Sequence, residues 1–353
     1  MTPKKDPENA QAELLPRHPS YRRKSESVAQ IAEQLAVELQ TNARTDALVF
    51  ARSIALAGLP KKPTKATSLQ RDLRLGKNLW LRVSYNTRGK RLPYGADRFV
   101  LAAIQHLAIL QDSPVVYFDR VGALLEMFGL DEGGQKLNRL RARFERISDL
   151  LISLVFAGSQ EELDEKPRTD TILVIRRTSL PTRAEMAASR EDDQLMLPLL
   201  PADRNGEVHP FGVQLSTDFW EMLKEQREQL IVPVELLKLF LDAPTGWDYL
   251  CFLVARCGRA KSSSVIDHHI LMGLFKEGDE PDRNTIARIQ RYHQLIMQAT
   301  RGSLNASIEE AGYFPKKKGQ RGRPKKRWVL KVGPSRSIVS SGKKQLPGDS
   351  PIN

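Results

Sequence analysis

The chain has 353 residues, of which 41% are hydrophobic, so it can bury the cores of about two domains. Its 55 Lys or Arg residues outnumber the 42 Asp or Glu residues, and the net charge of +13 favours a polyanionic partner such as nucleic acid. No run of about eighteen apolar residues occurs, and the first residues lack the apolar segment of a secretion signal, which excludes a membrane span and predicts a cytoplasmic protein.

The amino-terminal part of the chain divides by composition into three predicted segments. Residues 1–24 are polar and contain proline, which predicts a disordered tail. Residues 25–60 repeat apolar side chains at helical spacing, which predicts a helical segment. Residues 61–78 predict a basic linker, because the ten Lys or Arg residues between 61 and 91 are accompanied by a single acid, Asp72. We expect the lysines of this region to contact phosphates without regard to base sequence.

Residues 79–190 predict a first winged-helix domain. A strand with alternating apolar residues opens it, and a helix, strand, helix, helix and strand follow at residues 97–110, 115–118, 121–130, 135–155 and 171–180. The third helix carries an apolar stripe on one face and a basic stripe on another, made of Lys136, Arg139, Arg143 and Arg146. A recognition helix that enters a DNA groove needs this arrangement, although a solvated basic face would give the same pattern.

Residues 191–208 predict an interdomain linker, residues 209–335 a second domain with the same element order, and residues 336–353 a disordered basic tail. The long helix of the second domain exposes Arg283, Asn284, Arg288 and Arg291. The predicted fold is therefore α+β, mainly α, with two tandem winged-helix (helix-turn-helix) domains behind a partly disordered, helical amino-terminal extension. We expect Arg139, Arg143 and Arg288 to read guanine and Asn284 to read adenine in the major groove.

The segment "KKKGQRGRPKKRW", residues 316–328, holds eight basic residues in thirteen and lies between two predicted strands. This position predicts the wing of the second domain. Its centre, Arg321-Gly322-Arg323-Pro324, is similar to an AT-hook, in which an extended Arg-Gly-Arg lies in a narrow A·T minor groove. Together with Lys325, the two arginines either read that groove or only touch phosphates, and the sequence leaves both possibilities open.

A short apolar motif lies in the predicted interdomain linker, where Pro198 favours an extended backbone. It resembles the bacterial motif, Gln-Leu-x-Leu-Pro-Leu in form, by which replication proteins dock on the sliding clamp. The residues that match are Gln194, Leu195, Leu197 and Leu199. The alternative is a buried linker or strand between the domains.

Catalytic signatures are absent from the sequence. No phosphate-binding Gly-x-x-x-x-Gly-Lys-Ser/Thr motif occurs, and Cys251 and Cys257 have neither zinc nor redox spacing. Asp267, His268 and His269 include good metal ligands but lack the additional carboxylates of a two-metal site. We therefore expect no enzyme activity, no metal and no cofactor, and a primase or nuclease is disfavoured because clustered acids are missing.

Three separated blocks carry a resemblance to a known family. "LPYGADRFVLAAIQHLAI" (92–109), "VQLSTDFWEML" (213–223) and "VPVELLKLFLDAPTGWDYLCFLVAR" (232–256) together resemble the plasmid-encoded RepA-type replication initiators. The resemblance implies binding to iterons, the repeated double-stranded sites of a plasmid origin, and opening of adjacent A·T-rich DNA. It also implies a monomer–dimer equilibrium and recruitment of the host initiator and the replicative helicase in the bacterial cytoplasm. The alternative is a plasmid-borne transcriptional regulator or partition-type DNA binder with the same fold.

Overall fold

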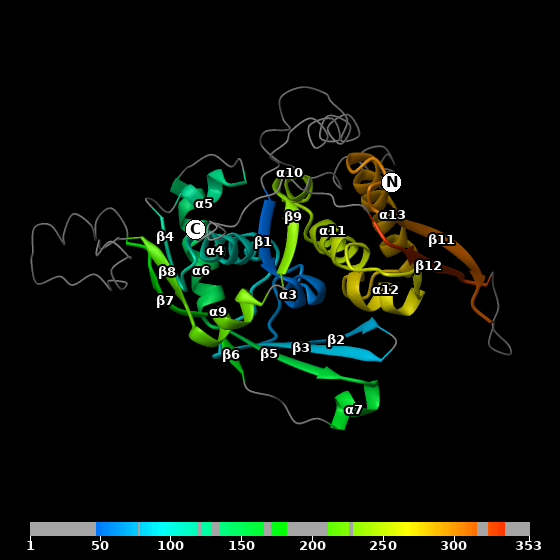
Figure 1. Cartoon of the computed structure of the whole chain (residues 1–353), viewed down its shortest axis with the longest axis horizontal. Coiled ribbons are helices and arrows are strands. Elements are labelled where there is room, and N and C mark those ends of the chain that lie inside the picture. Colours follow the sequence, from blue (N-terminus) through cyan, green and yellow to red (C-terminus); the bar gives the residue numbers. More distant parts are fainter. Residues whose placement is uncertain are drawn as a thin grey trace, which may run out of the picture.

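The structure is a computed structural model that describes residues 47–76, 78–118, 122–128, 134–165, 171–181, 211–225, 229–315 and 324–335 (Figure 1). Helices and four small antiparallel sheets alternate along this part of the chain. The predicted tails at 1–24 and 336–353, the clamp-like motif at 194–199 and the wing residues Arg321 and Arg323 lie outside the described residues.

The first winged-helix unit is built around three helices and a three-stranded sheet. Its elements are α4 (Asp97–Gln111), β4 (Val115–Tyr117), α5 (Ala123–Glu126), α6 (Gly134–Ser148), β7 (Ile175–Ser179) and β8 (Gly212–Leu215). The sheet order is β4-β8-β7, and each neighbouring pair is antiparallel. Strand β8 therefore lies between β7, its partner in the hairpin, and β4, which follows the first helix α4. This order is the winged-helix arrangement. Phe144 of α6 packs on Phe118 with ring centroids 6.4 Å apart.

The second unit repeats this topology element by element. Its elements are α11 (Pro244–Cys257), β10 (Ser264–Ile266), α12 (His268–Phe275), α13 (Asp282–Ala299), β11 (Ala306–Tyr313) and β12 (Lys326–Val332). The sheet order is β10-β12-β11, again antiparallel throughout. Phe275 packs edge-on against Tyr249 and Phe252 of α11, with centroids 5.3 and 5.5 Å apart. The α+β prediction with two tandem winged-helix units is confirmed by this repetition.

Strand β8 lies in the first unit, although the sequence predicts the residues from 209 onward to form the second domain. Val115 of β4 pairs with Gln214, and Ser179 of β7 pairs with Gly212. Residues 180–211, including the predicted interdomain linker at 191–208, therefore connect two strands of one sheet rather than two domains. The pairing is long-range, so the local pattern of "GVQL" could not indicate which sheet it joins.

A further sheet, with the strand order β2-β3-β5-β6, corrects two other predictions. It consists of β2 (Ser68–Gly76), β3 (Leu79–Thr87), β5 (Leu150–Ala157) and β6 (Ile172–Leu173), with α7 (Gln160–Glu165) packed beside it. The predicted basic linker at 61–78 contains β2, whose buried Leu73 pairs with Leu81. The predicted helix at 135–155 ends at Ser148, because the apolar run that follows extends as a strand. A short apolar run cannot be assigned to helix or strand by periodicity alone.

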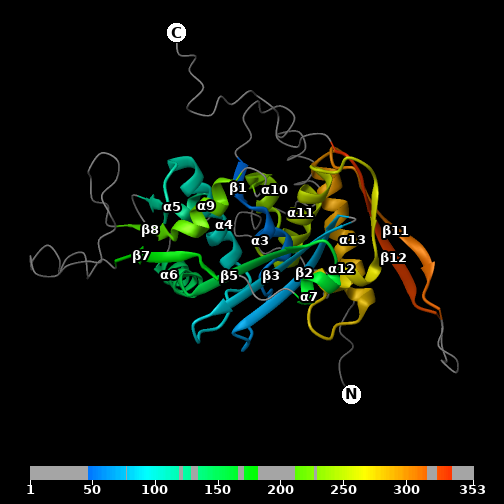
Figure 2. The same ribbon diagram turned by 60° about the horizontal axis from the view of Figure 1, so that its bottom comes forward.

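Two more strands form a two-stranded sheet that contacts both units. β1 (Ala47–Ala51) pairs antiparallel with β9 (Gln229–Pro233). The other elements are α3 (Arg52–Ala57), α9 (Thr217–Lys224) and α10 (Val234–Lys238). The predicted helical segment at 25–60 is thus a strand and a short helix over its described part. Both views place β1 between the two units and the two winged-helix hairpins at opposite ends of the molecule (Figures 1 and 2).

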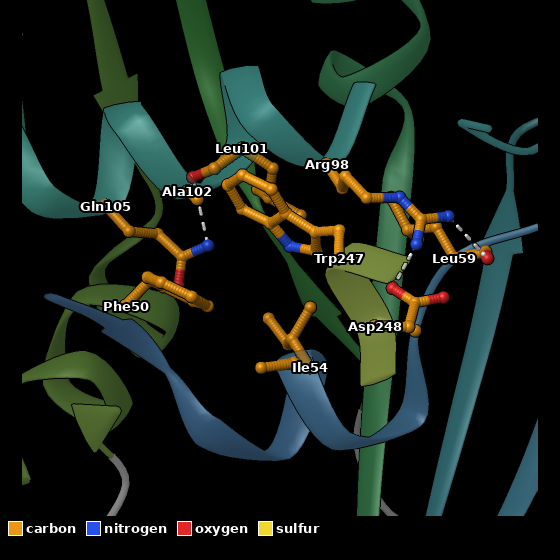
Figure 3. Close-up of a pocket in the computed structure, with 11 residues that line it drawn as sticks. Phe50, Ile54, Leu59, Arg98, Leu101, Ala102, Gln105, Trp247 and Asp248 are labelled. Atoms are coloured by element: carbon orange, nitrogen blue, oxygen red, sulfur yellow. Dashed lines mark hydrogen bonds and ion pairs between the residues drawn. The ribbon is translucent and has the colours of Figure 1, made fainter. Parts of the chain in front are cut away.

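The junction between the units is apolar around a buried ion pair (Figure 3). Trp247 of α11 lies 4.4 Å from Phe99 of α4, measured between ring centroids. Beside it, the Arg98 guanidinium of α4 forms an ion pair with Asp248 of α11 and donates to the Leu59 carbonyl at 2.9 Å. Gly58 has a φ of +64°, and a Cβ there would come within 2.8 Å of the Asp248 carboxylate. The first helices of the two units are therefore joined directly.

Candidate nucleic-acid interface

Helix α6 occupies the recognition-helix position of the first unit. Leu140, Phe144 and Ile147 are 0–1% exposed and hold one face of α6 in the core. Asn138 and Arg139 lie exposed on another face. Arg139 makes no ion pair with any residue that the structure describes. Its guanidinium is therefore available to a ligand.

Arg143 and Arg146 are turned toward α4 instead. Arg146 donates from Nε and Nη2 to the two carboxylate oxygens of Asp97, both at 2.8 Å, and its guanidinium lies 4.8 Å from the ring centroid of Tyr94. The hydrogen bond with Asp97 raises the pKa of Arg146. Arg143 Nε is 3.9 Å from Asp97 Oδ1, and burial lowers the pKa of Arg143. These contacts do not fit the predicted role of Arg143 in base reading, and Lys136 is half-buried on the first turn.

Helix α13 occupies the recognition-helix position of the second unit, and its first exposed turn carries Arg283 and Asn284. Arg283 makes no ion pair within the described part of the chain, and neither does the half-buried Arg291. Ala287, one turn after Arg283, is also exposed. The predicted placement of Arg283 and Asn284 on the outer face therefore agrees with the structure.

Arg288, the predicted guanine reader of α13, is held inside its own unit. It donates to the two carboxylate oxygens of Glu280 at 2.8 and 2.5 Å and to the Phe275 carbonyl at 3.1 Å. Burial would raise the pKa of Glu280, but hydrogen bonds from Arg288, the Glu277 amide and Thr285 outweigh it and lower the pKa to about 2. Arg288 therefore anchors α13 and does not fit a role in base reading.

The two recognition helices follow the same burial register. Leu140, Phe144 and Ile147 of α6 match Thr285, Ile289 and Tyr292 of α13, all of them buried. The same alignment matches the exposed pairs 138–139 and 283–284 and the anchoring arginines at 143 and 288. Asn138 is thus a candidate contact that the prediction from sequence missed. Its position directly before Arg139 and a buried leucine is the signal that could have found it.

The β11–β12 hairpin positions the predicted wing. The Phe314 amide donates to the Lys325 carbonyl at 2.9 Å, which continues the hairpin beyond the two strands. Lys326 is paired with Glu310 at 2.7 Å and Lys331 with Glu309 at 2.6 Å. Lys325 is exposed and has no ion-pair partner among the described residues. It is therefore the described wing residue that can reach a phosphate.

The lysines predicted to touch phosphates from the 61–90 region have different surroundings. Lys61 donates from Nζ to the Leu274 carbonyl at 3.1 Å, and burial lowers its pKa to about 8, which does not fit an outer contact. Lys62 pairs with Glu277 at 3.3 Å and Lys90 with Asp149 at 2.8 Å. Lys65 is exposed and without an ion-pair partner in the part of the chain that the structure describes.

The residues considered for other chemistry have structural contacts. Cys251 and Cys257 are buried free thiols, and burial raises the pKa of each. Asp267 pairs with Arg327 at 2.6 Å, while Nδ1 of His268 accepts a hydrogen bond from the Trp328 amide at 3.4 Å. Within the described ranges, no three His, Cys, Asp or Glu side chains are placed to hold a metal ion. Nor does any described helix have the length and apolarity needed to cross a membrane.

The fold and the two exposed helix faces define a tandem winged-helix protein. No protein-family model matches the sequence, and no curated protein matches it. A crystal structure of domains 2 and 3 of RctB is similar at 12% identity with a TM-score of 0.46, over 80% of this chain and 96% of that chain. A selenomethionine derivative of the same two domains gives 13% identity and a TM-score of 0.45, over 80% and 97%. The strand orders β4-β8-β7 and β10-β12-β11 within this chain define the fold of the two units.

Proposed function

We propose that this chain is a plasmid replication initiator that binds iterons, the repeated double-stranded sites of a plasmid origin, through its two winged-helix units. The observation that supports it is the repetition of one unit with an exposed Arg–Asn face on each third helix. A helix in this position of a helix-turn-helix unit enters the major groove, where Arg and Asn recognise guanine and adenine edges. Two such helices on one chain raise the effective concentration of the second contact.

The replication step of the proposal is supported by the sequence resemblance to RepA-type initiators. Bound at the origin, the protein opens adjacent A·T-rich DNA and recruits the host initiator and the replicative helicase, without enzyme chemistry of its own. Gln194, Leu195, Leu197 and Leu199 dock on the sliding clamp, and a monomer–dimer equilibrium controls origin binding. These steps take place in the bacterial cytoplasm.

DNA binding is tested by selecting double-stranded oligonucleotides from a random pool with the purified full chain. We expect one enriched sequence with two contacted segments about one helical turn apart. We also expect the logarithm of the binding constant to fall linearly with the logarithm of salt concentration, because lysines and arginines displace counterions from phosphates. A pool that stays random after repeated selection overturns the DNA-binding proposal.

Initiation is tested by transformation. A replicon that carries the origin but lacks this gene should be lost unless the protein is supplied from a second replicon. Maintenance of the replicon without the protein, combined with an enriched binding sequence, would instead indicate the transcriptional regulator or partition-type protein of the same fold.

A further inference from the structure

The two recognition helices present the same pair of residue types in opposite order. α6 exposes Asn138 and then Arg139, whereas α13 exposes Arg283 and then Asn284. Each pair comes directly before a fully buried residue, Leu140 in α6 and Thr285 in α13, at 1% and 0% exposure. The pairs therefore occupy equivalent positions on the outer surface of two equivalent helices.

Each helix continues this surface with an alanine one turn later. Ala142 follows Asn138 by four residues and Ala287 follows Arg283 by four residues, which places each alanine on the same face as its pair. A methyl side chain lets the helix approach the bases closely and can contact a thymine methyl group. The proposed contact surface of each unit thus consists of one Asn, one Arg and one Ala. The Asn precedes the Arg in α6 and follows it in α13.

Ion pairs, together with a buried face, fix the rotation of both helices about their own axes. Arg146 and Arg143 hold α6 to Asp97, which is 1% exposed. Arg288 holds α13 to Glu280 through two hydrogen bonds. The buried faces of the two helices, with Leu140, Phe144 and Ile147 in α6 and Thr285, Ile289 and Tyr292 in α13, turn the exposed pair outward in both units. The order of Asn and Arg along each helix therefore sets the order in which the two side chains meet a ligand on the outer surface.

We propose that each unit reads one G·C pair and one A·T pair, and that the exchange of Asn and Arg makes the two units read them in opposite order along their recognition helices. This inference rests on the proposed DNA binding. Arg donates two hydrogen bonds to O6 and N7 of guanine, and Asn pairs with N6 and N7 of adenine. Consecutive residues on a helix point about 100° apart, so the two side chains address neighbouring base pairs. The preferred DNA site consists of two related but unequal halves.

The test is a residue exchange within α6. A variant with Asn138→Arg and Arg139→Asn carries the α13 order in the first unit, and its selected sequence should exchange G·C and A·T in one half-site while the other stays as in wild type. The reciprocal variant, Arg283→Asn with Asn284→Arg, should change only the second half-site. Each variant is tested for binding only if its unfolding temperature matches that of the wild type. If one of the two variants does not fold, the other still tests the inference.

Single substitutions supply the magnitude and the control. Arg139→Ala should reduce discrimination at one base pair by about 5-fold to about 150-fold, since a bidentate Arg–guanine contact contributes about 1 to 3 kcal/mol. Lys65→Ala removes an equal charge from an exposed site and should weaken all sequences alike. If the exchange variants bind tightly but select the wild-type sequence, the inference is wrong and DNA binding stands. If the wild type selects no sequence, the proposed function itself fails.

Discussion

The two winged-helix units share one topology but hold their recognition helices in different ways. In the first unit, Asp97 of α4 anchors Arg146, and the two residues are 49 positions apart in the chain. In the second, Glu280 anchors Arg288 from only 8 positions away, in the turn before α13. The anchor of α6 therefore depends on tertiary structure, whereas the anchor of α13 is local to its own helix-turn-helix.

This difference links α6, but not α13, closely to the junction between the units. Asp97 is followed directly by Arg98, whose ion pair with Asp248 joins α4 to α11. One turn of α4 therefore positions both the first recognition helix and the second unit. A change in the junction should disturb α6 before it disturbs α13.

Arg98→Ala is expected to have the largest effect. It leaves the Asp248 carboxylate buried without its partner, and removal of one member of a buried ion pair costs about 3 to 5 kcal/mol of unfolding free energy. Urea denaturation followed by circular dichroism measures this loss. The double variant Arg98→Ala with Asp248→Ala should recover part of it, because no unpaired charge remains. A single variant as stable as wild type would contradict the importance of the pair.

Asp97→Asn should have the next largest effect, a loss of about 2 to 3 kcal/mol, because it weakens two charge-assisted hydrogen bonds to Arg146. The loss should be accompanied by faster amide hydrogen exchange in α6 than in α13. Asp149→Asn is the matched control, since Asp149 pairs with the exposed Lys90, and it should cost less than about 1 kcal/mol. Equal acceleration in both helices would argue against the difference between the units.

Glu280→Gln should cost about 1 to 2 kcal/mol, because the pair with Arg288 is local and partly screened by solvent. Here amide exchange should accelerate in α13 and stay unchanged in α6. This pattern is the reverse of the one expected for Asp97→Asn, in which exchange accelerates in α6. The two variants together therefore show whether each carboxylate anchors only its own helix.

The same variant should show a defined pH dependence. The pKa of Glu280 is lowered to about 2 in the folded chain, so the unfolded chain takes up its proton first as the pH falls. The stabilisation by this carboxylate is complete above about pH 4.5, the ordinary value for Glu, and is lost as the pH falls toward 2. The stability difference between wild type and Glu280→Gln should therefore close over this range. A difference that persists at pH 2 would assign the stabilisation to packing.

Glu310→Gln should have the smallest effect, on DNA binding rather than on stability. It releases the exposed Lys326 of the second wing from its cross-strand pair. The freed ammonium can neutralise one more phosphate, so the dependence of binding on salt should become steeper by about one unit. Fluorescence anisotropy with a random-sequence duplex at several salt concentrations measures this slope. Glu309→Gln releases Lys331 of the same strand in the same way. Comparison of the two salt slopes shows whether the effect is confined to the tip of the hairpin.

The elements that the sequence predicts well are those with strong local periodicity. The order of helices and strands in both units follows from amphipathic repeats, and the outward placement of Arg139, Arg283 and Asn284 follows from the same periods. The alternating pattern of β2 is hidden by its charged outer residues. The pairing of β8 with β4 joins segments about one hundred residues apart, and no local pattern encodes it.

The candidate site shows the same limit at the level of single side chains. Helical spacing places Arg143 and Arg288 near the basic face, but it cannot show that carboxylates from another segment meet them. An arginine beside a carboxylate and an arginine facing solvent have the same sequence signature. Only the tertiary contacts separate the arginines that anchor the helices from those that can reach a ligand.

The pairing of β1 with β9 has a consequence for synthesis of the protein. Ala51 is made 178 residues before its partner Gln229, and a ribosome adding about 5 to 20 residues per second needs about 9 to 36 seconds for that interval. During this time the wholly apolar strand "ALVFA" has no partner, and unpaired apolar strands are prone to aggregation. The nascent chain should therefore depend most on chaperones after β1 leaves the ribosome and before β9 follows it.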